Sequence, residues 1–318
     1  MALRRDPLLN ILVFGAGVLG SLYAARLHLA GHVVTVLARG ERYQQITEHG
    51  IVVAGARGEQ TLVAPVKAVD TLATDAAYDL IIVLVRKTQL SAALPALAAN
   101  RGTRNILFMV NNAAGPDEIA AAVGRDRVML GFPGAGGTRE GHIVRAVAVP
   151  ASVQKTTIGE LDGTISARLT EAARAFRDAG FAVAVSTNMD AWLKTHVALV
   201  SPIANGFYMA GDNYRLAKSP QGVRLTVRSI REGMRVLRAL GIPLTPGRMR
   251  LFEVLPESLL AFFAGRIFAM PFAELVMSKH AFAARDEMIM LADELRQLAR
   301  RAGVPTPASD ELYQYAIQ

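Results

Sequence analysis

Six residues near the start of the chain, Gly15-Ala16-Gly17-Val18-Leu19-Gly20, constrain its fold more than any other feature. The apolar run Leu8–Phe14 before them predicts a buried strand, Ser21–Ala30 predicts a helix, and Val33–Leu37 predicts a second strand. These elements, a strand, a glycine turn, a helix and a second strand, together take about 30 residues, which is the length of a βαβ unit. In a GxGxxG turn the glycines allow the tight turn, the approach of a pyrophosphate and close packing of helix on strand. This context predicts a dinucleotide-binding loop formed by all six residues.

Strands and helices continue to alternate until about residue 187. Leu80–Val85 and Ile106–Val110 are continuous apolar runs, as is typical of parallel strands that are buried on both faces. Beyond Asn188 the patterns predict helices at 190–208, 220–240, 258–272 and 283–302. We therefore predict an α/β fold in which a Rossmann-like dinucleotide-binding domain (residues 1–187) is followed by an all-helical domain (residues 188–318).

Composition excludes several classes of protein. The 318 residues include no cysteine, so disulfides, thiolate metal sites and cysteine nucleophiles are excluded, and we expect no metal site. The net charge is +8, but the basic residues are scattered, which indicates a surface that favours small anions rather than nucleic acid. No apolar stretch reaches the roughly 18 residues of a membrane span, and the run before the glycine loop is interpreted as a strand, not a signal peptide. We expect a cytoplasmic protein.

The end of the second predicted strand indicates which dinucleotide is preferred. NAD-binding proteins usually carry an acid there, which accepts hydrogen bonds from the ribose hydroxyls. This chain instead has Arg39, with Arg42 three residues on. A guanidinium binds a 2′-phosphate bidentately, so the sequence favours NADP. Glu41 lies nearby and leaves NAD open as an alternative.

A candidate proton donor lies at the start of the helical domain. Lys194 occurs in an otherwise apolar stretch between Trp192 and Val200. Such a lysine either extends along the helix to the surface or is buried for a purpose, such as general acid catalysis. The pattern alone leaves both interpretations open.

The chain resembles the ketopantoate reductases (2-dehydropantoate 2-reductases) over nearly its whole length. The similarity rests on the glycine loop, Arg39, the stretch Ile106–Asn112, the Trp192-x-Lys194 start of a helix, and a helix that carries Glu287 and leads into Gly303. It implies reduction of a 2-keto acid by NADPH, with Lys194 and Glu287 as catalytic residues. It also implies that the cofactor is contacted by Arg39, Arg86, Asn111, Gly137 and Glu287 as well as the glycine loop.

The substrate positions depart from the family pattern. The family has asparagines four and eight residues after the lysine, where this chain has Ala198 and Pro202, with Ser201 beside them. A family serine ahead of the glutamate is replaced by Leu275, with Ser278 close by. We therefore expect an anionic keto acid other than ketopantoate, bound by the set Lys194, Asn111, Ala198, Ser201 and Ser278. His196, Lys279 and His280 are further polar groups near this set.

Two alternatives remain at this point. One is a β-hydroxyacid dehydrogenase of the 6-phosphogluconate dehydrogenase type, against which Arg39 argues. The other is a non-catalytic NADP-binding sensor, against which the joint presence of Lys194 and Glu287 argues. The expected partners are a small keto acid and, since members of the resembled family often pair through the helical domain, a second copy of the chain.

Overall fold

The computed structural model describes residues 8–55 and 60–318, which form two compact units. The first unit runs to Val110 and resumes over Asp117–Met189, and the second comprises Asn111–Pro116 and Asp190–Gln318. The division therefore falls two residues beyond the predicted boundary, and it also assigns six residues from the middle of the first unit's sequence to the second unit. The predicted single boundary does not describe a unit that is made of two separate stretches of the chain.

The first unit contains an eight-stranded sheet in which every pair is parallel except β11 with β8. Ile11, Leu12 and Val13 of β1 are fully buried, as expected for a strand covered on both faces. The α/β fold predicted from the sequence is thus confirmed. In spatial order the strands are β12 (Val183–Val185), β11 (Thr156–Glu160), β8 (Val128–Phe132), β7 (Ile106–Phe108), β6 (Leu80–Val83), β1 (Asn10–Phe14), β2 (Val33–Leu37) and β5 (Lys67–Val69).

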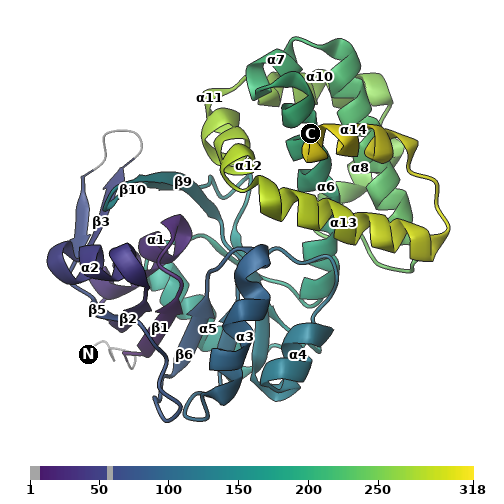
Figure 1. The fold of residues 1–318 in the computed structure, drawn as a ribbon. Helices are drawn as coiled ribbons and strands as arrows, with labels where there is room; N and C mark the ends of the chain where they lie inside the picture. The colour runs from purple at the N-terminus through teal and green to yellow at the C-terminus, as the bar shows by residue number, and fades with distance from the viewer. Residues whose placement is uncertain (1–7, 56–59) are drawn as a thin grey trace, which may run out of the picture. The chain divides into compact units, whose positions relative to one another are not determined.

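A second, four-stranded sheet completes this unit. Helix α1 contacts strands of both sheets (Figure 1). The strands of the second sheet, in order, are β4 (Leu62–Ala64), β3 (Ile51–Gly55), β10 (Ile143–Ala148) and β9 (Ala135–Glu140). The helices of the unit are α1 (Val18–Leu29), α2 (Gly40–His49), α3 (Leu90–Ala99), α4 (Asp117–Val123) and α5 (Ala167–Asp178), with short turns η1 (Lys87–Gln89) and η2 (Arg125–Arg127).

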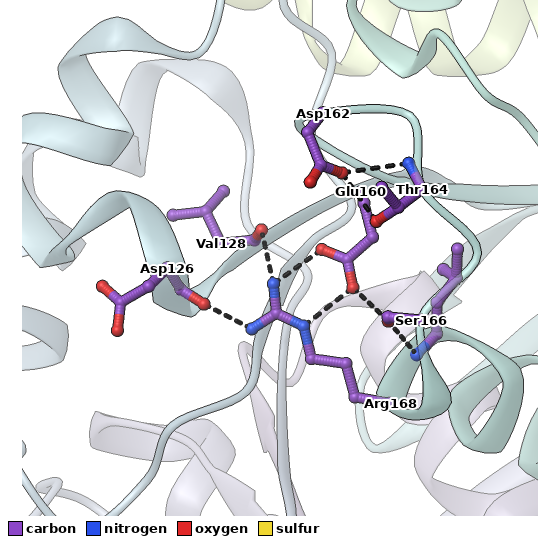
Figure 2. A network of polar contacts seen from close by, with 8 residues as sticks. Asp126, Val128, Glu160, Asp162, Thr164, Ser166 and Arg168 are labelled. Atoms are coloured by element: carbon purple, nitrogen blue, oxygen red, sulfur yellow. Dashed lines mark hydrogen bonds and ion pairs between the residues drawn. The ribbon is translucent and has the colours of Figure 1, made fainter.

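A partly buried ion pair fixes the antiparallel strand β11 to its surroundings (Figure 2). The Nε and Nη2 atoms of Arg168 donate to the two carboxylate oxygens of Glu160 at 2.8 and 2.6 Å, and Ser166 Oγ donates to the same carboxylate. Arg168 also donates to the carbonyl of Asp126 in η2. The hydrogen bond to Glu160 raises the pKa of Arg168. Because Glu160 is 5% exposed, the pair is little screened by water and anchors α5 and β11 to the β8 side of the sheet.

The second unit is helical. The long helix α6 (Met189–Ala210) runs through Pro202. Helix α13 (Arg285–Ala302) ends at Gly303 in the left-handed conformation, which is the stop that the sequence predicted. The remaining elements are α7 (Asn213–Ala217), α8 (Pro220–Ala239), η3 (Gly247–Arg250), α9 (Leu251–Val254), α10 (Glu257–Phe268), α11 (Pro271–Ala273), the π-helical turn η4 (Glu274–Ser278), α12 (Lys279–Ala283) and α14 (Pro307–Ile317).

Within residues 8–55 and 60–318, no single helix is long and apolar enough to cross a membrane. One bent pair, Glu257–Phe268 with Pro271–Ala283, meets the length and composition limits only when its two parts are joined across a 76° bend.

Candidate active site

The three glycines of the loop meet three different spatial demands. Gly15 has φ +112°, and a Cβ there would lie 2.5 Å from the carbonyl oxygen of Leu84. A Cβ on Gly20 would lie 1.8 Å from the carbonyl oxygen of Gly15. A Cβ on Gly17 would meet nothing within 4 Å. Gly15 and Gly20 are therefore required by the fold, whereas Gly17 faces open space that a ligand can occupy.

The start of α1 has the properties of an anion site. Gly17 is the N-cap, so no side chain accepts a hydrogen bond there, and the first turn holds no acidic residue. The amides of a helix N-terminus together with its dipole favour negative charge. Open space at Gly17 next to these amides fits a pyrophosphate.

The two arginines expected near the cofactor sugar have different surroundings. Arg39 follows β2 and is exposed at the N-cap of α2. Arg42 is buried, and its guanidinium donates to the Ala16 carbonyl (3.1 Å), Ser21 Oγ (2.9 Å) and the His142 carbonyl (3.1 Å). Burial, with a smaller contribution from Arg139, lowers the pKa of Arg42 to about 10. Arg42 therefore braces the glycine loop, and only Arg39 of the two has an exposed guanidinium for a phosphate.

Two other residues expected to contact the cofactor lie elsewhere in the first unit. Arg86 is exposed at the start of η1, with Lys87 buried beside it. Gly137 lies in β9 opposite Ala146, and a Cβ there would be 2.2 Å from the Arg145 carbonyl oxygen. The close approach of β10 is thus sufficient to explain this glycine, and its cofactor contact stays a prediction.

In the second unit, Lys194 is buried rather than extended to the surface, at 8% exposure. Its ammonium forms an ion pair with Asp190, one turn earlier on the same face of α6. A Cβ on Gly115 would lie 3.5 Å from Nζ, so the ammonium borders the Asn111–Pro116 segment. A buried ammonium held in one place by a carboxylate is suited to polarising and protonating an oxygen.

The Asn111–Pro116 segment is held to the helical unit along its length. The amides of Ala113 and Ala114 donate to Oε2 of Glu294 at 2.7 and 3.1 Å. Asn112 Nδ2 donates to the Gly115 carbonyl at 2.6 Å, which closes a turn at Gly115, where φ is +100°. The segment therefore presents its backbone to both α6 and α13.

Asn111 and Glu287 meet at the start of the segment. Asn111 Nδ2 lies 3.5 Å from Oε1 of Glu287, which is 3% exposed. Asn111 Oδ1 is buried and has no hydrogen-bond partner. Because buried polar groups are almost always paired, this acceptor fits a hydroxyl or amide donor from a ligand. Lys194, Asn111 and Glu287 thus converge on one six-residue segment.

The other expected substrate residues have different surroundings, and their contacts with a substrate stay predictions. Ala198 is fully buried against α8, where a Cβ on Gly233 would lie 3.0 Å from its own Cβ. Ser201 lines a cavity of about 10 Å³ with Ser229 and Ser309, which has room for about one water. Ser278 is buried at the end of η4.

Two members of the cluster were missed from the sequence. Asp190 is four residues before Lys194, and Glu294 is seven residues after Glu287, so each shares a helix face with a predicted residue. That spacing was the only signal available, and it is common among solvated helix carboxylates.

Histidine 196 lies on a different side of α6 from Lys194. Its ring stacks on Trp192, with centroids 5.2 Å apart and an interplanar angle of 10°. Burial, and to a smaller extent the charge of His280, lowers the pKa of His196 to about 3. The imidazole is therefore neutral near pH 7.

Comparison with known proteins identifies the family. A family model described as Ketopantoate reductase PanE/ApbA matches residues 11–163. The 2-dehydropantoate 2-reductase of Halobacterium salinarum is 30% identical over 239 residues, which cover 74% of this chain and 77% of that protein. The chain belongs to the ketopantoate reductase family. The enzyme of the same name from Archaeoglobus fulgidus is 29% identical over 61% of this chain and 63% of its own length.

Solved structures share the fold of this chain. A family member from Ralstonia eutropha JMP134 superposes with a TM-score of 0.77 at 20% identity, covering 96% of this chain and 97% of its own. D-mandelate dehydrogenase, solved with NADH and anilino(oxo)acetate, gives a TM-score of 0.77 at 18% identity over 96% and 97%. The family model and the two sequence relatives confirm the resemblance seen in the sequence, and the chain is an oxidoreductase of this family.

Proposed function

We propose that this ketopantoate reductase family member reduces a 2-keto acid to the 2-hydroxy acid with NADPH. The observation that carries the proposal is the buried Lys194 ammonium, which is paired with Asp190 and borders Gly115. Relatives named 2-dehydropantoate 2-reductase support the same chemistry. When bound, NADPH supplies the hydride that adds to the keto carbon.

The chain's own residues account for the proton and for orientation. As the carbonyl π pair moves to oxygen, Lys194 Nζ donates a proton to it, and the amine regains its proton from solvent. Asp190 keeps the ammonium in one position. Asn111, with its amide nitrogen toward Glu287, offers Oδ1 as an acceptor for a hydroxyl of the cofactor or substrate. These groups are fixed before the reaction, which reduces the cost of orienting the reactants.

The preference for NADP is supported by the surroundings of β2. Arg39 is exposed immediately after the strand, and Glu41 accepts a hydrogen bond from Gln45 Nε2 at 2.6 Å. The guanidinium of Arg39 is accessible to a 2′-phosphate, which supports NADP over NAD.

We further propose that the preferred substrate is a 2-keto acid other than ketopantoate. Ala198 is packed on Gly233, and Ser201 lines the small cavity beside α8 and α14, so neither supplies the side-chain amide that the resembled family carries after its lysine. D-mandelate dehydrogenase, with its bound anilino(oxo)acetate, illustrates that this fold can serve other 2-oxo acids.

A panel of 2-keto acids that includes ketopantoate tests both statements, with NADPH oxidation followed at saturating cofactor. We expect turnover of at least one acid, with kcat/KM for ketopantoate at least about tenfold below the best, as expected from one lost hydrogen bond to a buried group. Ketopantoate as the best substrate would contradict the altered pocket alone. No turnover of any acid would contradict keto-acid reduction.

We also propose that two copies pair through the helical unit. Large exposed apolar side chains concentrate on α9 and α10: Leu251, Val254, Phe262, Phe263 and Ile267. Apolar surface of this kind marks association sites. Phe262→Glu should shift the mass in analytical ultracentrifugation from dimer to monomer, whereas Ile165→Glu, at an exposed apolar residue of the first unit, should not. A monomeric parent protein would contradict the pairing.

A further inference from the structure

We infer that Glu294 is a positioning residue of the reduction site: its carboxylate holds the Asn111–Pro116 segment in the place where that segment meets Lys194 and Glu287. This inference rests on the proposed function and assigns a role to a residue that the motifs of the family did not indicate.

The contact itself is a strong one. A single oxygen of Glu294 accepts from two consecutive backbone amides, those of Ala113 and Ala114, at 2.7 and 3.1 Å. Glu294 is 7% exposed and Ala113 is fully buried, so water is largely kept from the bond to Ala113, whereas the bond from the exposed Ala114 is partly buried. Hydrogen bonds to a charged acceptor in such surroundings are stronger than those between neutral groups.

Glu294 and Glu287 act on adjacent parts of the segment. They lie seven positions apart on α13, which is about two helical turns, so their side chains leave the same face. Glu287 contacts the Asn111 side chain, and Glu294 accepts hydrogen bonds from the amides of Ala113 and Ala114. Glu287 thus lies against the Asn111 side chain, and Glu294 holds the backbone that follows it.

Glu294 is connected to the surroundings of Lys194 by the turn that Asn112 and Gly115 close. Asn112 Nδ2 bonds the Gly115 carbonyl across Ala113 and Ala114, so the two amides that Glu294 binds lie inside that turn. Gly115 then borders the Lys194 ammonium. A shift of the Ala113 and Ala114 amides would therefore move both Asn111 Oδ1 and the backbone beside Nζ. Misplacement of reacting groups by about 1 Å can reduce a rate by about 100-fold.

The same unit contains a matched control. Glu232 on α8 is 3% exposed and accepts from the backbone amides of Ala308 and Ser309 at 3.0 and 2.8 Å, and from Ser309 Oγ at 2.9 Å. It holds the start of α14 and contacts no residue of the Asn111–Pro116 segment in these bonds. Removing its charge disturbs an equivalent backbone anchor away from the proposed chemistry.

The experiment compares Glu294→Gln with Glu232→Gln in the full chain, using the best keto acid of the panel. We expect similar drops in Tm for the two variants. We expect Glu294→Gln alone to lower kcat by about 10- to 100-fold. Glu294→Asp, which restores the charge on a shorter side chain, should recover part of the loss. Hydrogen exchange of the Ala113 and Ala114 amides should accelerate in Glu294→Gln.

The outcomes separate the inference from the proposed function. Faster exchange at Ala113 and Ala114 with an unchanged kcat would overturn the positioning role while leaving keto-acid reduction intact. Equal losses of kcat in the Glu232 and Glu294 variants would also overturn it, because they would indicate a general effect on folding. Absence of turnover in the parent protein would overturn the proposed function itself.

Discussion

The glycine loop and the Lys194 cluster are built in opposite ways. The loop is six consecutive residues whose function depends on absent side chains, since Gly15 and Gly20 avoid clashes and Gly17 leaves open space. The cluster consists of buried charged and polar side chains from α6, α13 and the Asn111–Pro116 segment, and the Asn111–Glu287 contact spans 176 residues of sequence. The glycine loop therefore depends on the space around its backbone, and the Lys194 cluster depends on the charge and position of its side chains. Substitutions in the two sites should have different consequences.

The largest expected effect is at Lys194. Lys194→Ala removes the proton donor and should lower kcat by about 100- to 10,000-fold in a keto-acid assay. Binding of NADPH by fluorescence titration should change little, because the glycine loop is untouched. Lys218→Ala, at an exposed lysine of the same unit, is the control. Retained turnover in Lys194→Ala would show that another group donates the proton.

Substitution of the glycines should separate folding from binding. Gly20→Ala forces a methyl group into the Gly15 carbonyl and should cost about 3 kcal/mol of unfolding free energy. Gly17→Ala should change stability by less than about 1 kcal/mol, because its Cβ meets nothing, yet it should weaken NADPH binding. Denaturant unfolding and NADPH titration measure the two effects. Unchanged NADPH affinity in Gly17→Ala would contradict the assigned phosphate site.

Arg39 tests the cofactor preference within the first unit. Arg39→Ala should reduce the ratio of kcat/KM with NADPH to that with NADH by about 10- to 100-fold, which corresponds to the loss of one charged hydrogen-bonded pair. Arg42→Ala is the contrasting variant, and it should lower Tm because three bonds to the loop region are lost. An unchanged ratio in Arg39→Ala would argue against a 2′-phosphate at this position.

Ala198 tests whether the altered pocket can simply be reversed. Ala198→Asn introduces the residue type of the resembled family into a tight contact with Gly233, so we expect a loss of about 1–3 kcal/mol in unfolding free energy and no gain with ketopantoate. Ala210→Asn, at a half-exposed position of α6, should be tolerated. A stable Ala198→Asn variant with improved ketopantoate turnover would refute the packing argument.

The last expected effect concerns the pH dependence of stability. Because His196 has a pKa of about 3 in the folded protein, below its ordinary value near 6.5, the unfolded chain binds the extra proton in that interval. Stability should therefore fall as pH decreases from about 6.5 toward 3, with a contribution of up to about 1.4 kcal/mol per pH unit. His196→Gln should flatten the pH dependence of unfolding, whereas His49→Gln, at an exposed position, should leave it steep.

The same contrast explains what the sequence could predict. Periodicity and the glycine loop predicted the parallel sheet, α6 and α13, because those patterns are local. Those patterns did not predict β3, β4 or α14: β4 has only three residues, and α14 begins in a polar stretch. Lys194, Asn111 and Glu287 were identified by resemblance, but their convergence on one segment depends on tertiary packing. Asp190 and Glu294 could not be distinguished from ordinary helix carboxylates, because their partners are backbone groups and a lysine that only the fold brings near.

The assignment of Asn111–Pro116 to the helical unit has a consequence for how the family can be recombined. The chain crosses between its units three times, so no single cut separates them. A hybrid that takes only residues 190–318 from a relative would combine the relative's α13 with the Asn111–Pro116 segment of this chain. The residue in the place of Glu294 would then come from one protein and the amides that it binds from the other. The helical unit is therefore discontinuous in sequence. A hybrid that exchanges this unit between relatives must include the six residues Asn111–Pro116 together with the C-terminal helices.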